Sequence, residues 1–116
     1  MSDYFLKVIS LENCPYSNAA LELIKYNKIQ NNTTIISHSD KPKYKTNKID
    51  TFPQIYLSKY NKKETLLLGG YDSLSSFIAM FKGIPLSEQN INNFMNNNNT
   101  WSKKAVLRLI QLINQK

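Results

Sequence analysis

The chain has 116 residues, a formal net charge of +7, 41% hydrophobic residues and one cysteine. This length predicts a single domain, and a single cysteine excludes an internal disulfide framework. Lysine supplies most of the positive charge, which indicates either a solvated surface or attraction of anionic substrates. Because no nucleic-acid-binding module is recognisable, nucleic acid is not expected as a partner.

The chain starts with Met1-Ser2-Asp3, which lacks the basic region of a signal peptide. The apolar run that follows, Tyr4–Leu11, predicts a strand. Apolar residues fall on both of its faces, as is typical of a central, covered strand. No stretch approaches the roughly 20 apolar residues of a membrane span, so no membrane contact is expected. The lone cysteine favours a reducing, cytoplasmic location.

The turn after this strand carries the only cysteine, Cys14, followed by a helix-forming run to about Asn27. Pro15 falls at the first helical position, where its missing N–H costs nothing. Free N–H groups of Tyr16 and Ser17 should then point towards the sulfur, with the positive end of the helix dipole behind them. A thiol in this place is expected to have a lowered pKa. The alternative, a buried inert cysteine, suits strand interiors better than this turn.

Three further strands are predicted from β-branched and apolar runs, at residues 33–37, 52–58 and 65–68. Asn31-Asn32 is interpreted as a turn before the second strand, which should lie parallel to the first. The lysine-rich segment Asp40–Asp50 is expected to form a loop or a short helix. Residues 59–63 are interpreted as a hairpin turn, so the order strand, helix, strand, hairpin, helix predicts a mixed sheet.

The second half is predicted to be helical. Asp72 or Ser73 should cap a helix that ends before Gly83, and a short helix should span residues 87–95. We divide the chain into a domain at residues 1–95 and a C-terminal part at 96–116, an asparagine-rich linker followed by an amphipathic helix. That helix is interpreted as docked on the domain, with a dimer contact or a partner-binding segment as alternatives.

Three motifs resemble the glutaredoxin family. Cys14-Pro15-Tyr16-Ser17 resembles its active-site tetrad, in the form that lacks the second cysteine. Thr51-Phe52-Pro53-Gln54 is similar to its Thr-Val-Pro-Gln segment, and Gly69-Gly70-Tyr71-Asp72 to its Gly-Gly turn with an acidic residue. The resemblance covers residues 4 to about 93. It implies a thioredoxin-like α/β fold, a central mixed four-stranded sheet flanked by helices, here with an extra C-terminal helix.

The resemblance implies a glutathione-dependent thiol–disulfide oxidoreductase with Cys14 as the catalytic residue, supported by Pro15, Tyr16 and Ser17. Ser17 replaces the second cysteine, so the chemistry is expected to be monothiol reduction of protein–glutathione mixed disulfides. Glutathione is then the co-substrate, glutathionylated proteins are the partners, and no metal ligands are assigned. The chain is expected to be a monomer or weak dimer.

The resemblance also implies a cis peptide bond between Phe52 and Pro53, next to Cys14. The glutathione-binding set carried over from the family consists of Tyr16, Thr51, Phe52, Pro53, Gly70, Tyr71 and Asp72. Asp72 would meet the ammonium group of the γ-glutamyl end, with a helix cap as its alternative role.

Two positions depart from the family pattern. Leu11 stands where a lysine usually precedes the tetrad, and Asp50 replaces a basic residue before the Thr-Val-Pro segment. Lys45 or Lys48 are candidates to replace the missing charge.

Two other functions stay open. One is a [2Fe–2S] cluster shared by two chains and two glutathiones, which Pro15 disfavours. The other is a non-catalytic interaction module, which Leu11 favours slightly.

Overall fold

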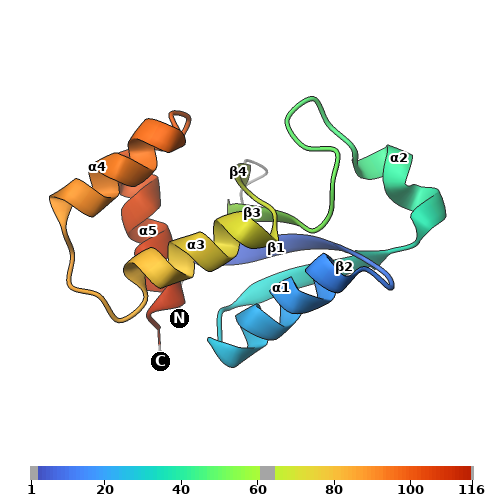
Figure 1. Cartoon of the computed structure of the whole chain (residues 1–116), viewed down its shortest axis with the longest axis horizontal. Coiled ribbons are helices and arrows are strands. Elements are labelled where there is room, and N and C mark those ends of the chain that lie inside the picture. The colour runs from blue at the N-terminus through green and yellow to red at the C-terminus, as the bar shows by residue number, and fades with distance from the viewer. Residues whose placement is uncertain (1–2, 61–64, 116) are drawn as a thin grey trace.

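The structure is a computed structural model that describes residues 3–60 and 65–115. Its strands form one sheet in the order β2-β1-β3-β4 (Figure 1). Their bounds are β1 (Tyr4–Leu11), β2 (Asn31–Ile36), β3 (Gln54–Lys59) and β4 (Thr65–Gly69). β1 pairs in parallel with β2, and the β1–β3 and β3–β4 pairs are antiparallel. The predicted mixed four-stranded sheet is confirmed.

The helices are distributed unevenly over this sheet. Those on the main core are α1 (Pro15–Tyr26), α3 (Tyr71–Phe81), α4 (Glu88–Asn97) and α5 (Lys103–Ile113). Between β2 and β3 there is only a 3-10 turn, η1 (His38–Asp40), and the four-residue helix α2 (Lys41–Tyr44). None of the helices in the described ranges is long and apolar enough to span a bilayer.

One face of the sheet, here called the covered face, carries the main core. Leu6 and Val8 of β1 project to this face and are fully buried. They belong to one apolar cluster with Ala20 and Ile24 of α1 and Phe77 of α3. Burial of each of the larger side chains, those of valine, leucine, isoleucine and phenylalanine, stabilises the fold by about 1.5–3 kcal/mol. The predicted apolar face of the first helix is therefore the face that meets the sheet.

Helix α5 joins the same core. Its residues Val106, Leu109 and Ile113 are fully buried, and Ser102 caps its first turn by accepting the N–H of Ala105 at 3.1 Å. Its apolar face is thus buried within the chain, which confirms the docked interpretation. Trp101, just before this helix, packs its ring edge-on against Phe94 of α4.

On the opposite face of the sheet, here called the open face, a second apolar cluster lies near the end of β1. Ile9 and Leu11 form this cluster with Ile36, and Tyr44 of α2 packs against it. Lys7, two positions before Ile9 on the same face, is exposed. The prediction that both faces of β1 are covered is right at Ile9 and wrong at Lys7, because α2 is too short to reach the middle of the sheet.

Several predicted boundaries need correction. Asn31-Asn32 is not a turn: both residues belong to β2 and pair with Leu6 and Lys7 of β1. Neither Asp72 nor Ser73 caps α3, which begins at Tyr71 with Gly70 as its N-cap. Helix α4 continues to Asn97, into the expected linker. Of the hairpin turn predicted at residues 59–63, Lys59 belongs to β3, and residues 61–63 lie outside the described residues.

Candidate active site

Cys14 lies where β1 passes into α1. Asn13 has a left-handed conformation (φ +55°), which asparagine tolerates better than most residues, and it turns the chain at the end of the strand. Cys14 is the N-cap of α1, and its carbonyl accepts the N–H of Asn18 at 2.9 Å. Pro15 occupies the first turn of the helix as predicted. The thiol is therefore half-buried at the positive end of a helix dipole.

The surroundings of Cys14 act on its thiol in opposite directions. Burial alone raises the pKa. The backbone N–H and hydroxyl of Ser17, the backbone N–H of Tyr16 and the charge of Lys41 lower it, and together they hold the pKa of Cys14 below its ordinary value. The N–H groups of Tyr16 and Ser17, which the sequence assigns to the sulfur, are among the influences that lower the pKa of Cys14. The lowered pKa gives Cys14 a larger fraction of thiolate near neutral pH than a free cysteine has.

Ser17 is held in place by the strand that precedes it. Its side chain is fully buried, and its hydroxyl oxygen accepts the backbone N–H of Leu11 at 3.0 Å. The hydroxyl proton is then free to donate to the sulfur of Cys14, in agreement with the lowered pKa. Ser17 thus fastens the start of α1 to the end of β1 and stabilises the thiolate.

Lys41 is a feature of the site that the sequence did not indicate. It lies at the start of α2, and its positive charge lowers the pKa of Cys14. The sequence suggested Lys45 or Lys48 as the replacement for a basic residue at position 11. Leu11 itself is buried in the apolar cluster against which Cys14 packs, so that position has no room for a charge. No local motif marks Lys41, because its place depends on how α2 packs.

The second and third motifs come together at Pro53. The peptide bond between Phe52 and Pro53 is cis, as expected, and Pro53 is fully buried. Phe52 packs against the same apolar cluster as Cys14. A Cβ atom on Gly70 would lie 3.5 Å from the carbonyl oxygen of Pro53, so the Gly-Gly turn runs beside that segment. The Thr-Phe-Pro segment therefore lies beside both the apolar cluster of Cys14 and the Gly-Gly turn.

The remaining residues predicted to bind glutathione differ in how exposed their side chains are. The ring of Tyr16 is 64% exposed, and Thr51 and Asp72 are exposed as well. Asp72 lies in the first turn of α3 and makes no capping hydrogen bond, which leaves its carboxylate open to solvent. Tyr71 packs against the covered-face core. Across the described parts of the chain, no three His, Cys, Asp or Glu side chains lie together as potential metal ligands.

Comparisons with known proteins agree with this architecture. No protein-family model matches the chain, and no curated protein matches it by sequence. Among solved structures it is similar to glutaredoxin 1 from Francisella tularensis, crystallised in complex with cacodylate. The TM-score is 0.53 and the identity 23%, over 66% of this chain and 93% of the other. The chain therefore has a thioredoxin-like α/β fold, as the sequence predicted.

Proposed function

We propose that this protein is a monothiol, glutathione-dependent thiol–disulfide oxidoreductase that reduces protein–glutathione mixed disulfides through Cys14. The observation that carries the proposal is the thiol itself. It belongs to the N-cap residue of α1, and its pKa is lowered by the hydroxyl of Ser17, by the N–H groups of Ser17 and Tyr16 and by the charge of Lys41. Disulfide exchange requires such a thiolate together with an approach path to a disulfide sulfur.

In the first step, the thiolate of Cys14 attacks the glutathione sulfur of the mixed disulfide. The disulfide bond of the substrate breaks, the protein thiolate leaves, and Cys14 is joined to glutathione. In the second step, the thiolate of another glutathione attacks the glutathione sulfur on Cys14. Oxidised glutathione leaves, and the Cys14 thiolate is restored. Each cycle frees one protein thiol, consumes one reduced glutathione and releases one oxidised glutathione, and it requires no second cysteine in the chain.

The side chains around Cys14 have the chemistry that a glutathione groove requires. Lys41 brings a positive charge for a carboxylate, in place of the lysine missing at position 11. The open carboxylate of Asp72 suits the ammonium of the γ-glutamyl group, and the start of α3 suits its carboxylate. Tyr16 offers an exposed ring as a wall. Because the one cysteine of the chain is an unpaired thiol, we expect the protein to work in a reducing, cytoplasmic compartment.

The test is intact mass spectrometry of the full chain after incubation with oxidised glutathione. We expect one glutathione added at Cys14, quickly removed by reduced glutathione, and no adduct on Cys14→Ser. An unmodified chain whose thiol is still alkylated by iodoacetamide would overturn the proposal and favour the non-catalytic interaction module. A brown protein with visible absorbance after anaerobic purification would instead favour the [2Fe–2S] alternative.

A further inference from the structure

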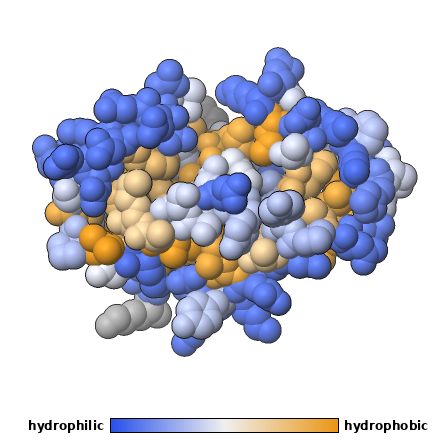
Figure 2. Space-filling view, in the orientation of Figure 1, coloured by the Kyte–Doolittle hydropathy of each residue, from blue (hydrophilic) through white to orange (hydrophobic). Residues whose placement is uncertain are grey.

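A second concave site lies on the open face of the sheet, apart from the residues assigned to glutathione. It is a cleft of about 790 Å³, within the ordinary range for ligand sites. Of the residues named above for the glutathione reaction, its lining includes only Gln54, the last residue of the Thr-Phe-Pro-Gln motif, and Lys48, a candidate for the missing charge. In Figure 1, the α2 segment and the α4–α5 pair rise on opposite sides of the sheet, and Figure 2 shows a hollow between these two lobes.

The floor of this cleft is apolar and aromatic. Ile9 of β1, Tyr56 of β3 and Leu67 of β4 contribute to it, and Tyr44 of α2 forms part of a wall. The amide of Gln54 links that wall to the floor, because it donates to the carbonyl of Tyr44 at 2.8 Å and accepts the Tyr56 hydroxyl at 2.9 Å. The side chain of Tyr56 and the backbone of Tyr44 are thus held in place before any ligand arrives.

The charge of the cleft has one sign. Its charged lining residues are Lys7, Lys43 and Lys48, and no carboxylate is among them. Lys43 forms an exposed ion pair with Asp40 at 3.3 Å. Lys7 and Lys48 make no ion pair with any residue of segments 3–60 and 65–115. A cleft of one charge with low-dielectric walls concentrates its field, so these two ammonium groups attract anions.

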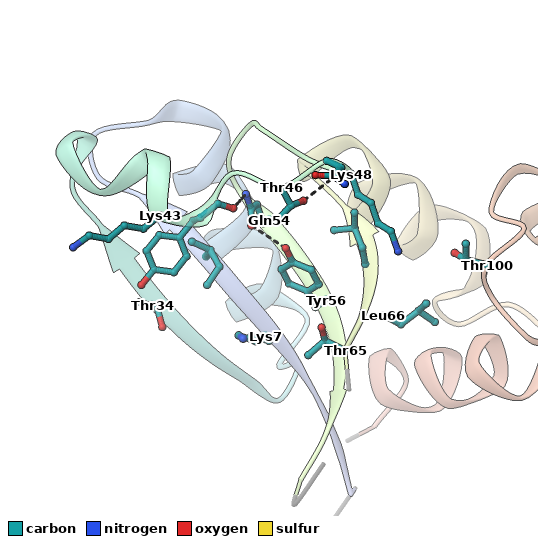
Figure 3. Close-up of a pocket in the computed structure, with 14 residues that line it drawn as sticks. Lys7, Thr34, Lys43, Thr46, Lys48, Gln54, Tyr56, Thr65, Leu66 and Thr100 are labelled. Carbon is teal, nitrogen blue, oxygen red and sulfur yellow. Dashed lines mark hydrogen bonds between the residues drawn. The ribbon is translucent and has the colours of Figure 1, made fainter. Parts of the chain in front are cut away.

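Lys7 is the clearest sign of a binding role. It stands in the second strand from one edge of the sheet, between Phe5 and Ile9 on the same face, where an apolar residue would normally support a covering helix. In Figure 3, Tyr56 lies between Lys7 and Lys48. A ligand that spans the cleft in this view would meet a lysine, an aromatic ring and a second lysine in turn.

The geometry points to a binding site for a small organic anion that combines a flat ring with a phosphate or carboxylate group, of about the size of a mononucleotide. The ring would lie on the floor at Tyr56 and Ile9, and the anionic group would pair with Lys7 or Lys48. The site needs no thiol chemistry, and its occupation is independent of the reaction proposed for Cys14.

The experiment is an NMR titration of the ¹⁵N-labelled full chain with adenosine monophosphate, adenosine, inorganic phosphate and 2-naphthoate. We expect at least one ring anion to shift the amide signals of Lys7, Ile9, Tyr56 and Leu67. That ring anion should bind about tenfold more tightly than uncharged adenosine or phosphate alone, and more weakly at high salt. Adenosine monophosphate binding alone would identify phosphates as the preferred group, and naphthoate binding alone would identify carboxylates.

Variants test which residues hold the anion. Lys7→Gln and Lys48→Gln should each weaken binding about three- to tenfold, whereas Lys25→Gln on α1 removes an exposed charge elsewhere and should change nothing. Cys14→Ser should bind like the unchanged chain, which separates this site from the thiol reaction. Equal affinity for adenosine and its phosphate, shifts confined to Tyr16 and Gly70, or no binding of either ring anion would overturn the proposal.

Discussion

The two faces of one sheet carry different parts of this molecule. Leu6 and Val8 are fully buried on the covered face, whereas Lys7 between them is exposed on the other. The difference follows from the connections: the crossover from β1 to β2 contains the 12-residue α1, whereas the connection from β2 to β3 contains the four-residue α2. The covered face supplies most of the stability and the open face leaves polar groups available for binding. Cys14 lies at the end of β1, beside the apolar cluster of the open face.

The largest expected effect comes from removing a buried side chain from the core on the covered face. Leu109→Ala on α5 should lower the free energy of unfolding by about 2–5 kcal/mol, because it removes a side chain that is 0% exposed and leaves a cavity. Urea denaturation followed by circular dichroism measures this. The control is Ile35→Ala, a position 65% exposed, with an expected loss below about 0.5 kcal/mol. Equal losses in both variants would mean that α5 is not part of the core.

A smaller effect should follow from removing the hydrogen bonds by which Gln54 links α2 to β3 on the open face. Gln54→Leu removes the bonds from this buried amide to Tyr44 and Tyr56, at a cost of about 1–3 kcal/mol. Hydrogen exchange should become faster in α2 while α1 keeps its protection. Tyr56→Phe removes only one of the two bonds and should therefore cost less. Unchanged exchange in α2 would show that its position does not depend on Gln54.

Ser17→Ala tests the environment of the Cys14 thiol at the end of β1. It removes a donor to Cys14, so the pKa of the thiol should rise. The rate of alkylation by iodoacetamide against pH reports this pKa. We expect a midpoint below the value of about 8.5 for free cysteine in the unchanged chain, and a higher midpoint in the variant. Ser76→Ala on α3, an exposed serine, is the control.

The lowered pKa of Cys14 also determines how its ionisation changes the stability of the fold with pH. Because the pKa of Cys14 is lower in the folded chain than in the unfolded one, its thiolate stabilises the fold above the unfolded pKa. That contribution is lost as the pH falls through the folded pKa. An alkylation midpoint at or above that of free cysteine would contradict the proposed environment of the thiol.

Lys41→Gln should give the smallest shift. Its charge is the last of the influences that lower the pKa of Cys14, so the alkylation midpoint should rise less than in Ser17→Ala. High salt should reduce the difference from the unchanged chain, since partly exposed charges are screened. Lys45→Gln, an exposed lysine four residues along, is the matched control. If Lys45→Gln has the greater effect, the assignment of the charge to Lys41 is wrong.

The features that could be predicted from the sequence are those that neighbouring residues determine. The strand at Tyr4–Leu11, the helix start at Pro15 and the inward helix face of Ala20 and Ile24 all follow from local pattern and turn chemistry. The prediction of four strands in one mixed sheet is confirmed as well. These elements carry strong periodic or capping signals within a few residues.

The features that were missed depend on contacts between distant segments. Asn31-Asn32 favours a turn by residue type, but pairing with Leu6 and Lys7 makes it a strand. Lys41 reaches Cys14 only because Tyr44 anchors α2 to the second apolar cluster. The exposure of Lys7 likewise depends on how far that segment extends over the sheet. No window of sequence around these residues contains that information.

The indole of Trp101 affects how readily separate molecules of this protein can pair through the edge of the sheet. Its N–H donates to the carbonyl of Leu67 at 3.1 Å, in the strand at one end of the sheet order. An unpaired carbonyl on such an outer strand can accept a strand from a neighbouring chain and so begin aggregation. The segment that joins α4 to α5 therefore removes one site for intermolecular strand addition from the β4 edge of the sheet in concentrated solution.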